Sequence, residues 1–499
     1  MILGIDQGTT GTRACVMALS GQIVSWAYKT HRQIHPGPGM VEHDPGEILE
    51  NTLAVIREAM GRAHQPRIQG IGLANQGETV MLWDRTTGEP LHNAIVWQDT
   101  RTRLEMQALE NDPSAVSGIA ERTGLRPDSY FSASKIRWLL DNAPGAREVL
   151  QSGNLCAGTL DSWLIWHLGG RRAFVTDPST AARTLLYNIG TLDYDDWLLG
   201  LFGVDRATLP AVVPSAGVFT STLGVMASTG LPDGVPVVAG LVDQPAGMIG
   251  IGCLDAGEVK ATFGTGCFVY MNTGNQSARS RNGLLSTVAW QRDGAVTYAL
   301  DGGVFVAGSL VNWLEKMRII HGRDEIASLV RAVRCADGVV CVPAMAGLAA
   351  PYWDRAARGA FMGLDLSTSR SCIVRAALEG IACRVAQVVN AMSADSGSAP
   401  SALRVDGGLS DCEPLMQIQA DLLGIPIQVS SQTEATVAGV CFLAARAQGL
   451  WAGDQEIRRH VGTRKTFEPS ISADERGEKI YAFERAVASV RSLGGGRDA

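Results

Sequence analysis

The stretch of sequence that decides the fold is Ile2-Leu3-Gly4-Ile5-Asp6-Gln7-Gly8-Thr9-Thr10-Gly11-Thr12-Arg13. Its apolar first part predicts a buried strand, and Asp6 stands at the end of that strand. A carboxylate in this place suits Mg²⁺, because a hard cation prefers oxygen ligands. Gly8 and Gly11 let the backbone approach closely, so that its N–H groups can face phosphate oxygens.

The side chains of the same turn also fit a phosphate. Thr9 and Thr10 offer neutral hydrogen-bond donors, and Arg13 offers a positive charge. The alternative is an ordinary hairpin turn that leads into a second strand from Ala14 to Leu19. Taken alone, the turn fits the hairpin better, and the phosphate interpretation depends on the motifs that follow.

Length and composition indicate a globular protein of two large domains. The chain has 499 residues, 46% of them hydrophobic and 19% charged, and its net charge is −7. A chain of this length is too long to fold around a single hydrophobic core. Its negative net charge argues against nonspecific nucleic-acid binding. The ten cysteines form no CxxC pair, so we expect a reducing cytoplasm rather than a zinc site or a disulfide framework. We expect neither a signal peptide nor a membrane anchor.

The hydrophobic pattern predicts two successive series of strands and helices. In the first, Asp44-Pro45-Gly46-Glu47 has the pattern of a helix start. Strands are predicted at 68–74, 79–84 and 235–242, and a helix at 132–140. In the second, strands at 259–263, 268–272 and 403–405 alternate with helices after Ser371, before Gly424 and at 436–448. We therefore expect an N-terminal domain at 1–244, a C-terminal domain at 245–491 and a disordered tail at 492–499.

Three polar turns between apolar strands favour a nucleotide cleft. Neither a P-loop nor a complete dinucleotide-binding motif occurs in the chain. Gly264-Thr265-Gly266 and Asp406-Gly407-Gly408 instead resemble the turn at the N-terminus. Each of them alone is more often a plain hairpin, but three such turns that converge would enclose a nucleotide from opposite sides.

Two further motifs fit a polar substrate. Asn75-Gln76-Gly77-Glu78-Thr79 follows a buried strand and fits either hydroxyl recognition or a solvated loop. Asp243-Gln244 ends another buried strand at the junction of the two halves, where open α/β proteins place ligands. Asp243 is either a helix N-cap or a general base for a substrate hydroxyl. Trp97 and Phe268 fit an apolar wall or the core.

Several long segments resemble the FGGY family of carbohydrate kinases. They are Asn93-Ala94-Ile95-Val96-Trp97-Gln98-Asp99, Tyr130-Phe131-Ser132-Ala133, Ala157-Gly158-Thr159-Leu160-Asp161-Ser162-Trp163, Gly264-Thr265-Gly266-Cys267-Phe268 and Ala350-Pro351-Tyr352-Trp353-Asp354. The resemblance runs from Ile2 to about Val490 and is strongest to the members that phosphorylate glycerol. It implies two α/β domains of the actin-like, ribonuclease H-like type, with an interdomain cleft for ATP, Mg²⁺ and a sugar or polyol.

The resemblance also implies roles for individual residues. Asp6 is expected near the metal, and Asp243 is expected as the catalytic base. The expected substrate contacts are Glu78, Trp97, Tyr130, Asp243, Gln244 and Phe268. The expected nucleotide contacts are Thr9, Thr10, Gly11, Arg13, Thr265, Gly308, Asn312, Gly408 and Cys412.

The chain departs from the glycerol-phosphorylating members at three places. Those members carry an arginine where Gly77 stands. Its charge-assisted hydrogen bonds would be worth about 1.5–3 kcal/mol, so we expect glycerol to bind about 10- to 150-fold more weakly and the vacated volume to admit a further hydroxylated carbon. Cys412 replaces an asparagine near the adenine, which would relax nucleotide affinity or base preference. The stretch 224–236 lacks the loop associated with inhibition by sugar bisphosphates, and we expect no such regulation.

These observations together predict an ATP-dependent kinase that phosphorylates a terminal hydroxyl of a small polyol, glycerol first. A kinase for a four-carbon polyol or a ketose such as a pentulose is the alternative within the same chemistry. A non-catalytic nucleotide-binding regulator on the actin-like fold is the alternative from another class. The family suggests a homo-oligomer, either a dimer or a tetramer.

Overall fold

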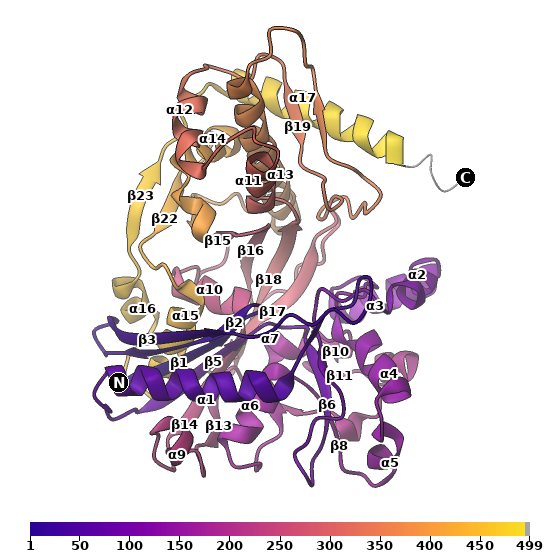
Figure 1. Ribbon diagram of the computed structural model, residues 1–499, viewed down its shortest axis with the longest axis vertical. Helices are drawn as coiled ribbons and strands as arrows, with labels where there is room; N and C mark the ends of the chain where they lie inside the picture. The colour runs from indigo at the N-terminus through magenta and orange to yellow at the C-terminus, as the bar shows by residue number, and fades with distance from the viewer. Residues whose placement is uncertain (495–499) are drawn as a thin grey trace.

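The computed structural model describes residues 1–494, which form two lobes, each built on a mixed β-sheet flanked by helices (Figure 1). The first sheet has the order β13-β14-β5-β1-β2-β3, with β1 (Ile2–Gln7), β2 (Gly11–Met17), β3 (Ile23–Thr30), β5 (Gly70–Asn75), β13 (Ala216–Ser221) and β14 (Pro236–Val242). The second has the order β17-β18-β16-β15-β21-β22-β23, with β15 (Val259–Phe263), β16 (Cys267–Gly274), β17 (Leu285–Arg292), β18 (Ala295–Val304), β21 (Leu403–Asp406), β22 (Ile427–Ser430) and β23 (Thr463–Phe467).

Smaller sheets and helices complete the two lobes. A four-stranded sheet joins β4 (Glu42–His43), β7 (Ala94–Ile95), β6 (Val80–Asp84) and β8 (Leu155–Thr159), and three pairs join β9 (Val175–Thr176) with β12 (Ala211–Val212), β10 (Tyr187–Asn188) with β11 (Asp193–Tyr194), and β19 (Val340–Val342) with β20 (Ala360–Met362). The helices are α1 (Pro45–Arg62), α2 (Arg103–Glu110), α3 (Pro113–Thr123), α4 (Ser132–Asn142), α5 (Ala146–Gln151), α6 (Leu160–Leu168), α7 (Pro178–Ala181), α8 (Asp196–Phe202), α9 (Met226–Thr229), α10 (Asp243–Gly250), α11 (Gly308–Lys316), α12 (Ile326–Arg331), α13 (Arg370–Ser396), α14 (Glu413–Leu423), α15 (Ala435–Ala447), α16 (Asp454–His460) and α17 (Ala473–Gly494), with the 3₁₀ turns η1 (Arg206–Thr208), η2 (Arg323–Glu325) and η3 (Gly408–Asp411).

The two large sheets repeat one plan. In the first, β1 is parallel to β5 on one side and antiparallel to β2 on the other. In the second, β15 is parallel to β21 and antiparallel to β16. The predicted two-lobed α/β fold is therefore confirmed.

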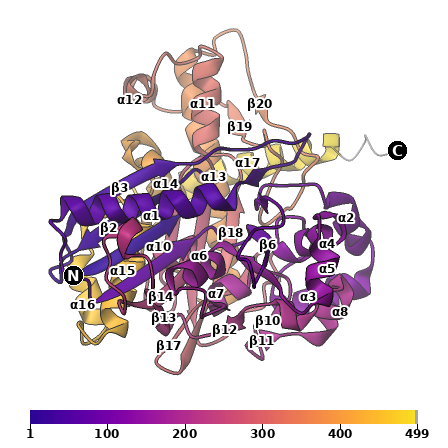
Figure 2. The same cartoon turned by 60° about the horizontal axis from the view of Figure 1, so that its bottom comes forward.

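The strand that opens the chain is buried on both faces. Alternate residues of a strand point to opposite sides, so Leu3 and Ile5 share a core with Ile48 of α1, whereas Ile2 shares another with Val437 of α15. Figure 2 shows α1 in front of these strands and α15 behind them. A helix from the second half of the chain therefore covers one face of the first sheet.

Two helices cross at the junction of the lobes with their backbones in contact. A Cβ atom on Gly250 of α10 would collide with the carbonyl oxygen of Ala435, and one on Gly439 of α15 would collide with that of Ala246. Only glycine lets the two helices approach so closely. The crossing joins α15 to the segment that leads from the first lobe into the second.

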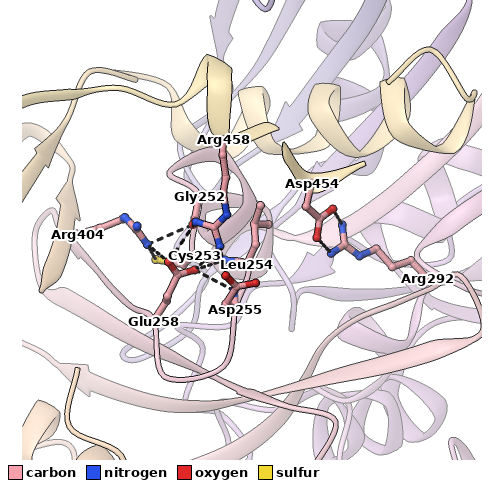
Figure 3. Close-up of polar contacts among 9 residues, drawn as sticks. All are labelled: Gly252, Cys253, Leu254, Asp255, Glu258, Arg292, Arg404, Asp454 and Arg458. Carbon is pink, nitrogen blue, oxygen red and sulfur yellow. Dashed lines mark hydrogen bonds and ion pairs between the residues drawn. The ribbon is translucent and has the colours of Figure 1, made fainter. Parts of the chain in front are cut away.

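A network of ion pairs fixes the turn between α10 and β15 (Figure 3). The carboxylate of Glu258 accepts hydrogen bonds from Arg404 of β21 at 2.7 Å and from Arg458 of α16 at 3.1 Å. Beside it, Arg292 of β17 donates to both oxygens of Asp454, at 2.9 and 2.5 Å. The network therefore ties α16 to the second sheet.

Some of the predicted boundaries differ from the structure. The second strand runs over Gly11–Met17 rather than Ala14 to Leu19, because its hydrogen bonds to β1 begin directly after the turn. Helix α17 continues to Gly494, so 492–494 are helical rather than disordered as predicted, and the remainder of the predicted tail, 495–499, lies outside the described residues. Throughout residues 1–494, no helix combines the length and the apolar character needed to cross a membrane.

Candidate active site

Three neighbouring parallel strands of the first sheet bring the predicted polar motifs to one edge. In the ladder, Asn75 at the end of β5 lies between Gln7 of β1 and Val242 of β14. Asp6, the segment 75–79 and Asp243 therefore leave the sheet at the same edge. In the second sheet, Thr262 before the Gly264-Thr265-Gly266 turn is paired with Asp406, so the other two glycine turns also share an edge.

The turn after β1 is both a hairpin and an ordered loop. The Gly8 N–H donates to the carbonyl of Gly11 at 3.0 Å, which closes the hairpin. The indole N–H of Trp97 donates to Thr9 Oγ1 at 2.9 Å, and His31 Nε2 donates to the Thr9 carbonyl at 2.9 Å. Thr10 Oγ1 lies 3.2 Å from the hydroxyl of Tyr28. The two interpretations of this turn are therefore compatible with one another.

Arg13 already has an anionic partner. Its guanidinium forms an ion pair with Glu434, which directly precedes α15. It also lies 5.7 Å from the ring centroid of Trp26 and 5.2 Å from that of Tyr28. In this conformation its charge is directed to Glu434, and its predicted contact with a phosphate stays a prediction.

Asp243 is the first residue of α10, and hydrogen bonds fix its surroundings. The Gln244 N–H donates to Asp243 Oδ1 at 2.7 Å, and Lys260 Nζ donates to Gln244 Oε1 at 2.8 Å. Burial raises the pKa of Asp243, and the charge of Lys260 opposes the rise. Lys260 is itself buried, in the middle of β15.

Asp243 lies within electrostatic range of both Asp6 and the predicted substrate residues. Burial and then the charge of Asp243 raise the pKa of Asp6 to about 7. Burial also raises the pKa of Glu78; Arg183 opposes this rise, and Asp243 adds to it. Asp243 is therefore near enough to affect the pKa of both Asp6, which is expected near the metal, and Glu78, which is expected to contact the substrate.

A cavity of about 190 Å³ lies between the lobes, and three predicted substrate residues, Trp97, Tyr130 and Phe268, border it. The ring centroids of Trp97 and Tyr130 are 5.4 Å apart in an edge-to-face arrangement. The other walls combine aromatic or aliphatic residues with polar ones. The apolar residues are Phe131, Leu285, Phe305, Ala349 and Trp353, and the polar ones include Gln98, Asp99, Thr100, Asp128, Ser129 and Arg355. The cavity suits a small molecule with an apolar face.

Arg183 and Asp301 also border this cavity, and the sequence analysis missed both. Arg183 donates from Nε to Glu78 Oε1 at 2.7 Å and from Nη1 to Asp301 Oδ2 at 3.0 Å. Lys260 was missed as well. The available signal was a charge inside an apolar strand, because Asp301 lies in β18 and Lys260 in β15. Arg183 lies in the segment after α7 and gives no such signal.

The space beside Gly77 is filled, so the expectation of a vacated volume there is wrong. A Cβ atom on Gly77 would lie 3.0 and 3.1 Å from the two methyl groups of Val242 and 3.4 Å from Arg183 Cγ. Contacts at 3.0–3.1 Å are tighter than ordinary van der Waals contact.

A larger cavity of about 850 Å³ lies in the second lobe, and the predicted nucleotide residues Gly408 and Cys412 border it. Arg323 borders it too and donates to Asn312 Oδ1 at 2.8 Å. The Gly264-Thr265-Gly266 turn lies against the start of α11, where the Gly308 N–H donates to the Gly264 carbonyl at 3.0 Å. Any side chain on Gly308 would press on that carbonyl, since its Cβ would lie 2.5 Å away.

Asp6 is the one residue that the sequence analysis predicts to lie near a metal ion. Within residues 1–494, no group of three or more histidine, cysteine, aspartate or glutamate side chains is arranged to hold a metal ion. Asp6 and Asp243 are nonetheless close enough for one to raise the pKa of the other. Mg²⁺ commonly takes one or two carboxylates and completes its shell with water and substrate phosphates.

Two lobes of one plan, with a large cavity in the second lobe and a small one between the lobes, are the arrangement expected of a two-lobed sugar kinase. Comparison with protein families makes this specific. The family models described as the N-terminal and C-terminal domains of the FGGY family of carbohydrate kinases match residues 1–250 and 259–448. The chain belongs to the FGGY family of carbohydrate kinases.

Individual relatives resemble the chain along its whole length. It is 46% identical to a glycerol kinase of Alkalilimnicola ehrlichii over 500 aligned residues, which cover 100% of this chain and 99% of that protein. It is 45% identical to a glycerol kinase of Stenotrophomonas maltophilia, with 98% of each chain covered. Among solved structures, Plasmodium falciparum glycerol kinase with ADP has a TM-score of 0.93 and 33% identity, with 98% of each chain covered. A gluconate kinase of Lactobacillus acidophilus, at 22% identity and a TM-score of 0.90, shares the fold.

Proposed function

We propose that this protein transfers the γ-phosphate of ATP to a terminal hydroxyl of a small polyol, and that glycerol is the first acceptor to test. The proposal is supported by full-length relatives named glycerol kinase at 46% and 45% identity. The observation that carries it is the position of Asp243, which lies within electrostatic range of both Asp6 and Glu78. A proton acceptor for the attacking hydroxyl is needed at such a position, between the phosphate and the acceptor.

Asp243 acts as the general base in this proposal. A base works best when its pKa lies near the working pH, and burial raises the pKa of Asp243 toward that range. The Gln244 N–H holds one carboxylate oxygen and leaves the other for the substrate. Phosphoryl transfer otherwise depends on positioning and on neutralising charge, which the closed lobes and the glycine turns would supply.

Asp6 is proposed to hold Mg²⁺ or its water shell, beside Asp243. Burial and the neighbouring carboxylate raise the pKa of Asp6, and a divalent cation would relieve the repulsion between these two groups. When bound, Mg²⁺ neutralises the oxygens of the β- and γ-phosphates. The protein's own contribution is to hold the two carboxylates at one edge of the first sheet.

The nucleotide is proposed to lie in the larger cavity, with its phosphates near the Thr265 turn and the turn after β1. Gly408 and Cys412 border that cavity, and Asn312 is fixed by Arg323. Thr9, Thr10, Gly11 and Gly308 are proposed to supply backbone N–H groups and hydroxyls to the phosphates. The adenine of the nucleotide would contact Cys412, whose thiol is a poorer hydrogen-bond partner than an amide.

The acceptor is proposed to lie between Glu78, Tyr130, Gln244, Trp97 and Phe268. The aromatic side of the cavity leaves room for a four-carbon polyol as an alternative to glycerol, and a pentulose is the next candidate. A nucleotide-dependent regulator without phosphoryl transfer remains the alternative from another class. Such a regulator would need no general base like Asp243, because it would transfer no phosphate to a hydroxyl.

ADP release from MgATP tests these alternatives directly. The purified protein would be assayed with glycerol, erythritol, pentitols and pentuloses at matched concentrations, with ATP alone as the control. We expect acceptor-dependent release with glycerol or with erythritol. ADP release that no acceptor stimulates would support the regulator and refute the kinase proposal.

Three further properties belong to the same proposal. We propose the cytoplasm as the location, in line with ten free cysteines in the described chain. We also propose a homodimer or homotetramer, to be tested by light scattering coupled to size-exclusion chromatography. The boundary between the two functional domains is proposed near residue 244, although α15 packs on the first sheet.

A further inference from the structure

Arg183 joins the two lobes beside the small cavity. Its side chain is only 4% exposed, and it carries a positive charge between Glu78 of the first lobe and Asp301 of the second. The Nε–H and one N–H of Nη1 are used in these two ion pairs, at 2.7 and 3.0 Å. Each carboxylate therefore occupies one edge of the planar guanidinium.

The Nη2 amino group of the guanidinium is free to bind a ligand. Arginine has five N–H donors in a fixed plane, and in the described part of the chain the two on Nη2 meet no hydrogen-bond acceptor. Arg183 also borders the 190 Å³ cavity together with Tyr130 and Phe268. Nη2 is not among the buried atoms that lack a partner, so it faces accessible space, where a ligand oxygen can accept its hydrogen bonds.

The stem of Arg183 is held in place by packing. Its Cγ atom would lie 3.4 Å from a Cβ atom on Gly77, and Val242 fills the other side of that glycine at 3.0 Å. A Cβ atom at position 77 would therefore be in ordinary contact with the stem of Arg183 and in tight contact with Val242. The aromatic rings of Tyr130 and Phe131 lie 5.7 and 5.3 Å from the guanidinium carbon and limit its movement.

We propose that Arg183 is an acceptor-recognition residue, whose Nη2 donates a charge-assisted hydrogen bond to a hydroxyl of the polyol that is not phosphorylated. This inference rests on the proposed function and deepens it, because it identifies which protein group selects the acceptor. The preferred acceptors are then polyols with a second hydroxyl placed to reach Arg183. Longer members of the class extend along the aromatic wall, away from Gly77.

The proposal is tested by combining two changes. Acceptors that lack one hydroxyl of glycerol are compared with glycerol, and Arg183 is replaced by lysine, which cannot reproduce the planar guanidinium. The acceptors are glycerol, 1,2-propanediol and 1,3-propanediol, each of which is titrated into the protein with MgADP by calorimetry and assayed for kcat/KM with MgATP. We expect the wild type to prefer glycerol about 10- to 150-fold over the diol that lacks the recognised hydroxyl, the fold-change of one charge-assisted hydrogen bond. In Arg183→Lys this preference falls at least tenfold, and the KM for MgATP stays unchanged.

Lysine is the chosen replacement because it keeps the charge that Glu78 and Asp301 require. Arg384→Lys is the matched control, since Arg384 is equally buried but borders neither cavity. A second variant, Gly77→Val, leaves Arg183 intact. It adds two methyl groups to a Cβ that would already be in contact with the stem of Arg183 at 3.4 Å, and should weaken the same preference. Gly61→Val is its control, because a Cβ at Gly61 meets nothing within 4 Å.

The outcomes separate the inference from the proposed function. Polyol binding without ADP release in the wild type would refute the kinase proposal, while the calorimetric preference would still test Arg183. An active Arg183→Lys variant whose affinities for all three acceptors fall in parallel would overturn the inference, because Arg183 would then act only on the structure. Should Arg183→Lys fail to fold, an unchanged preference in Gly77→Val would overturn it equally.

Discussion

Replacing Asp243 by asparagine keeps the size of the side chain and removes its capacity to accept a proton. A general base contributes 10²- to 10⁴-fold to a rate, which corresponds to about 2.7–5.5 kcal/mol of activation free energy. We therefore expect Asp243→Asn to lower kcat by about 10²- to 10⁴-fold. The hydrogen bond from the Gln244 N–H can be kept by the asparagine oxygen, so the fold should persist.

The same substitution has a second, independent signature. The charge of Asp243 contributes to the raised pKa of Asp6, which is about 7. Without that charge the pKa of Asp6 falls, and the acidic limb of the rate profile should move to lower pH.

The assay is ADP release over a pH series, with saturating acceptor and MgATP. Asp161→Asn is the control, because Asp161 is also a buried carboxylate with a raised pKa, about 6, but is bonded to Thr159 and Thr176 and borders neither cavity. A residual rate above about one tenth of the wild type, below the usual contribution of a base, would refute the assignment of Asp243.

Three more outcomes are expected. Burial raises the pKa of Asp6 to about 7, so Asp6 should stabilise the unliganded protein at low pH, and this contribution should be lost as the pH rises from the unfolded pKa near 4 to about 7. Asp6→Asn should therefore flatten the fall of the unfolding temperature over this pH range. A fall that is as steep in Asp6→Asn as in the wild type would contradict the burial of the carboxyl. Cys412→Asn would place an amide at the edge of the large cavity near Arg323. One neutral hydrogen bond from this amide to the adenine, worth about 0.5–1.5 kcal/mol, should lower the KM for ATP about 2- to 12-fold. Equal KM values in the variant and the wild type would mean that the adenine lies elsewhere. Glu258→Gln should destabilise the fold by about 1–3 kcal/mol, because Arg404 and Arg458 lose a partly buried charged partner. Burial raises the pKa of Glu258, but the hydrogen bonds from Arg458, the Asp255 N–H and Arg404 outweigh burial and lower it. The wild-type advantage should therefore disappear as the pH falls through that lowered pKa, and an advantage that persists there would refute the ion-pair account.

Local sequence signals were sufficient for the longer elements that the sequence analysis located. The Asp44-Pro45-Gly46-Glu47 pattern predicted a helix, and Asp44 indeed caps α1 by accepting from the N–H groups of Gly46 and Glu47. The apolar stretch 235–242 coincides with β14 apart from one residue. These signals work because capping and burial of strands depend on neighbouring residues in the chain.

The contacts that shape the candidate site depend on residues far apart in sequence, and for that reason they were missed. Arg183 lies between Glu78 and Asp301, which are 105 and 118 positions away. The packing of Val242 beside Gly77 likewise has no local signature. A departure at a single position can thus suggest an empty space that a distant side chain occupies.

The covering of β1 by α15 has a consequence for how the protein is made. Helix α15 begins at Ala435, 428 positions after β1 ends at Gln7. On the ribosome, the first sheet therefore waits with one apolar face unprotected until nearly the whole chain has been translated. Domains generally fold as units from the N-terminus, but this lobe cannot be completed in that order. Nascent chains that stop before residue 435 should consequently bind chaperones or aggregate, even though they contain every residue of the turn after β1.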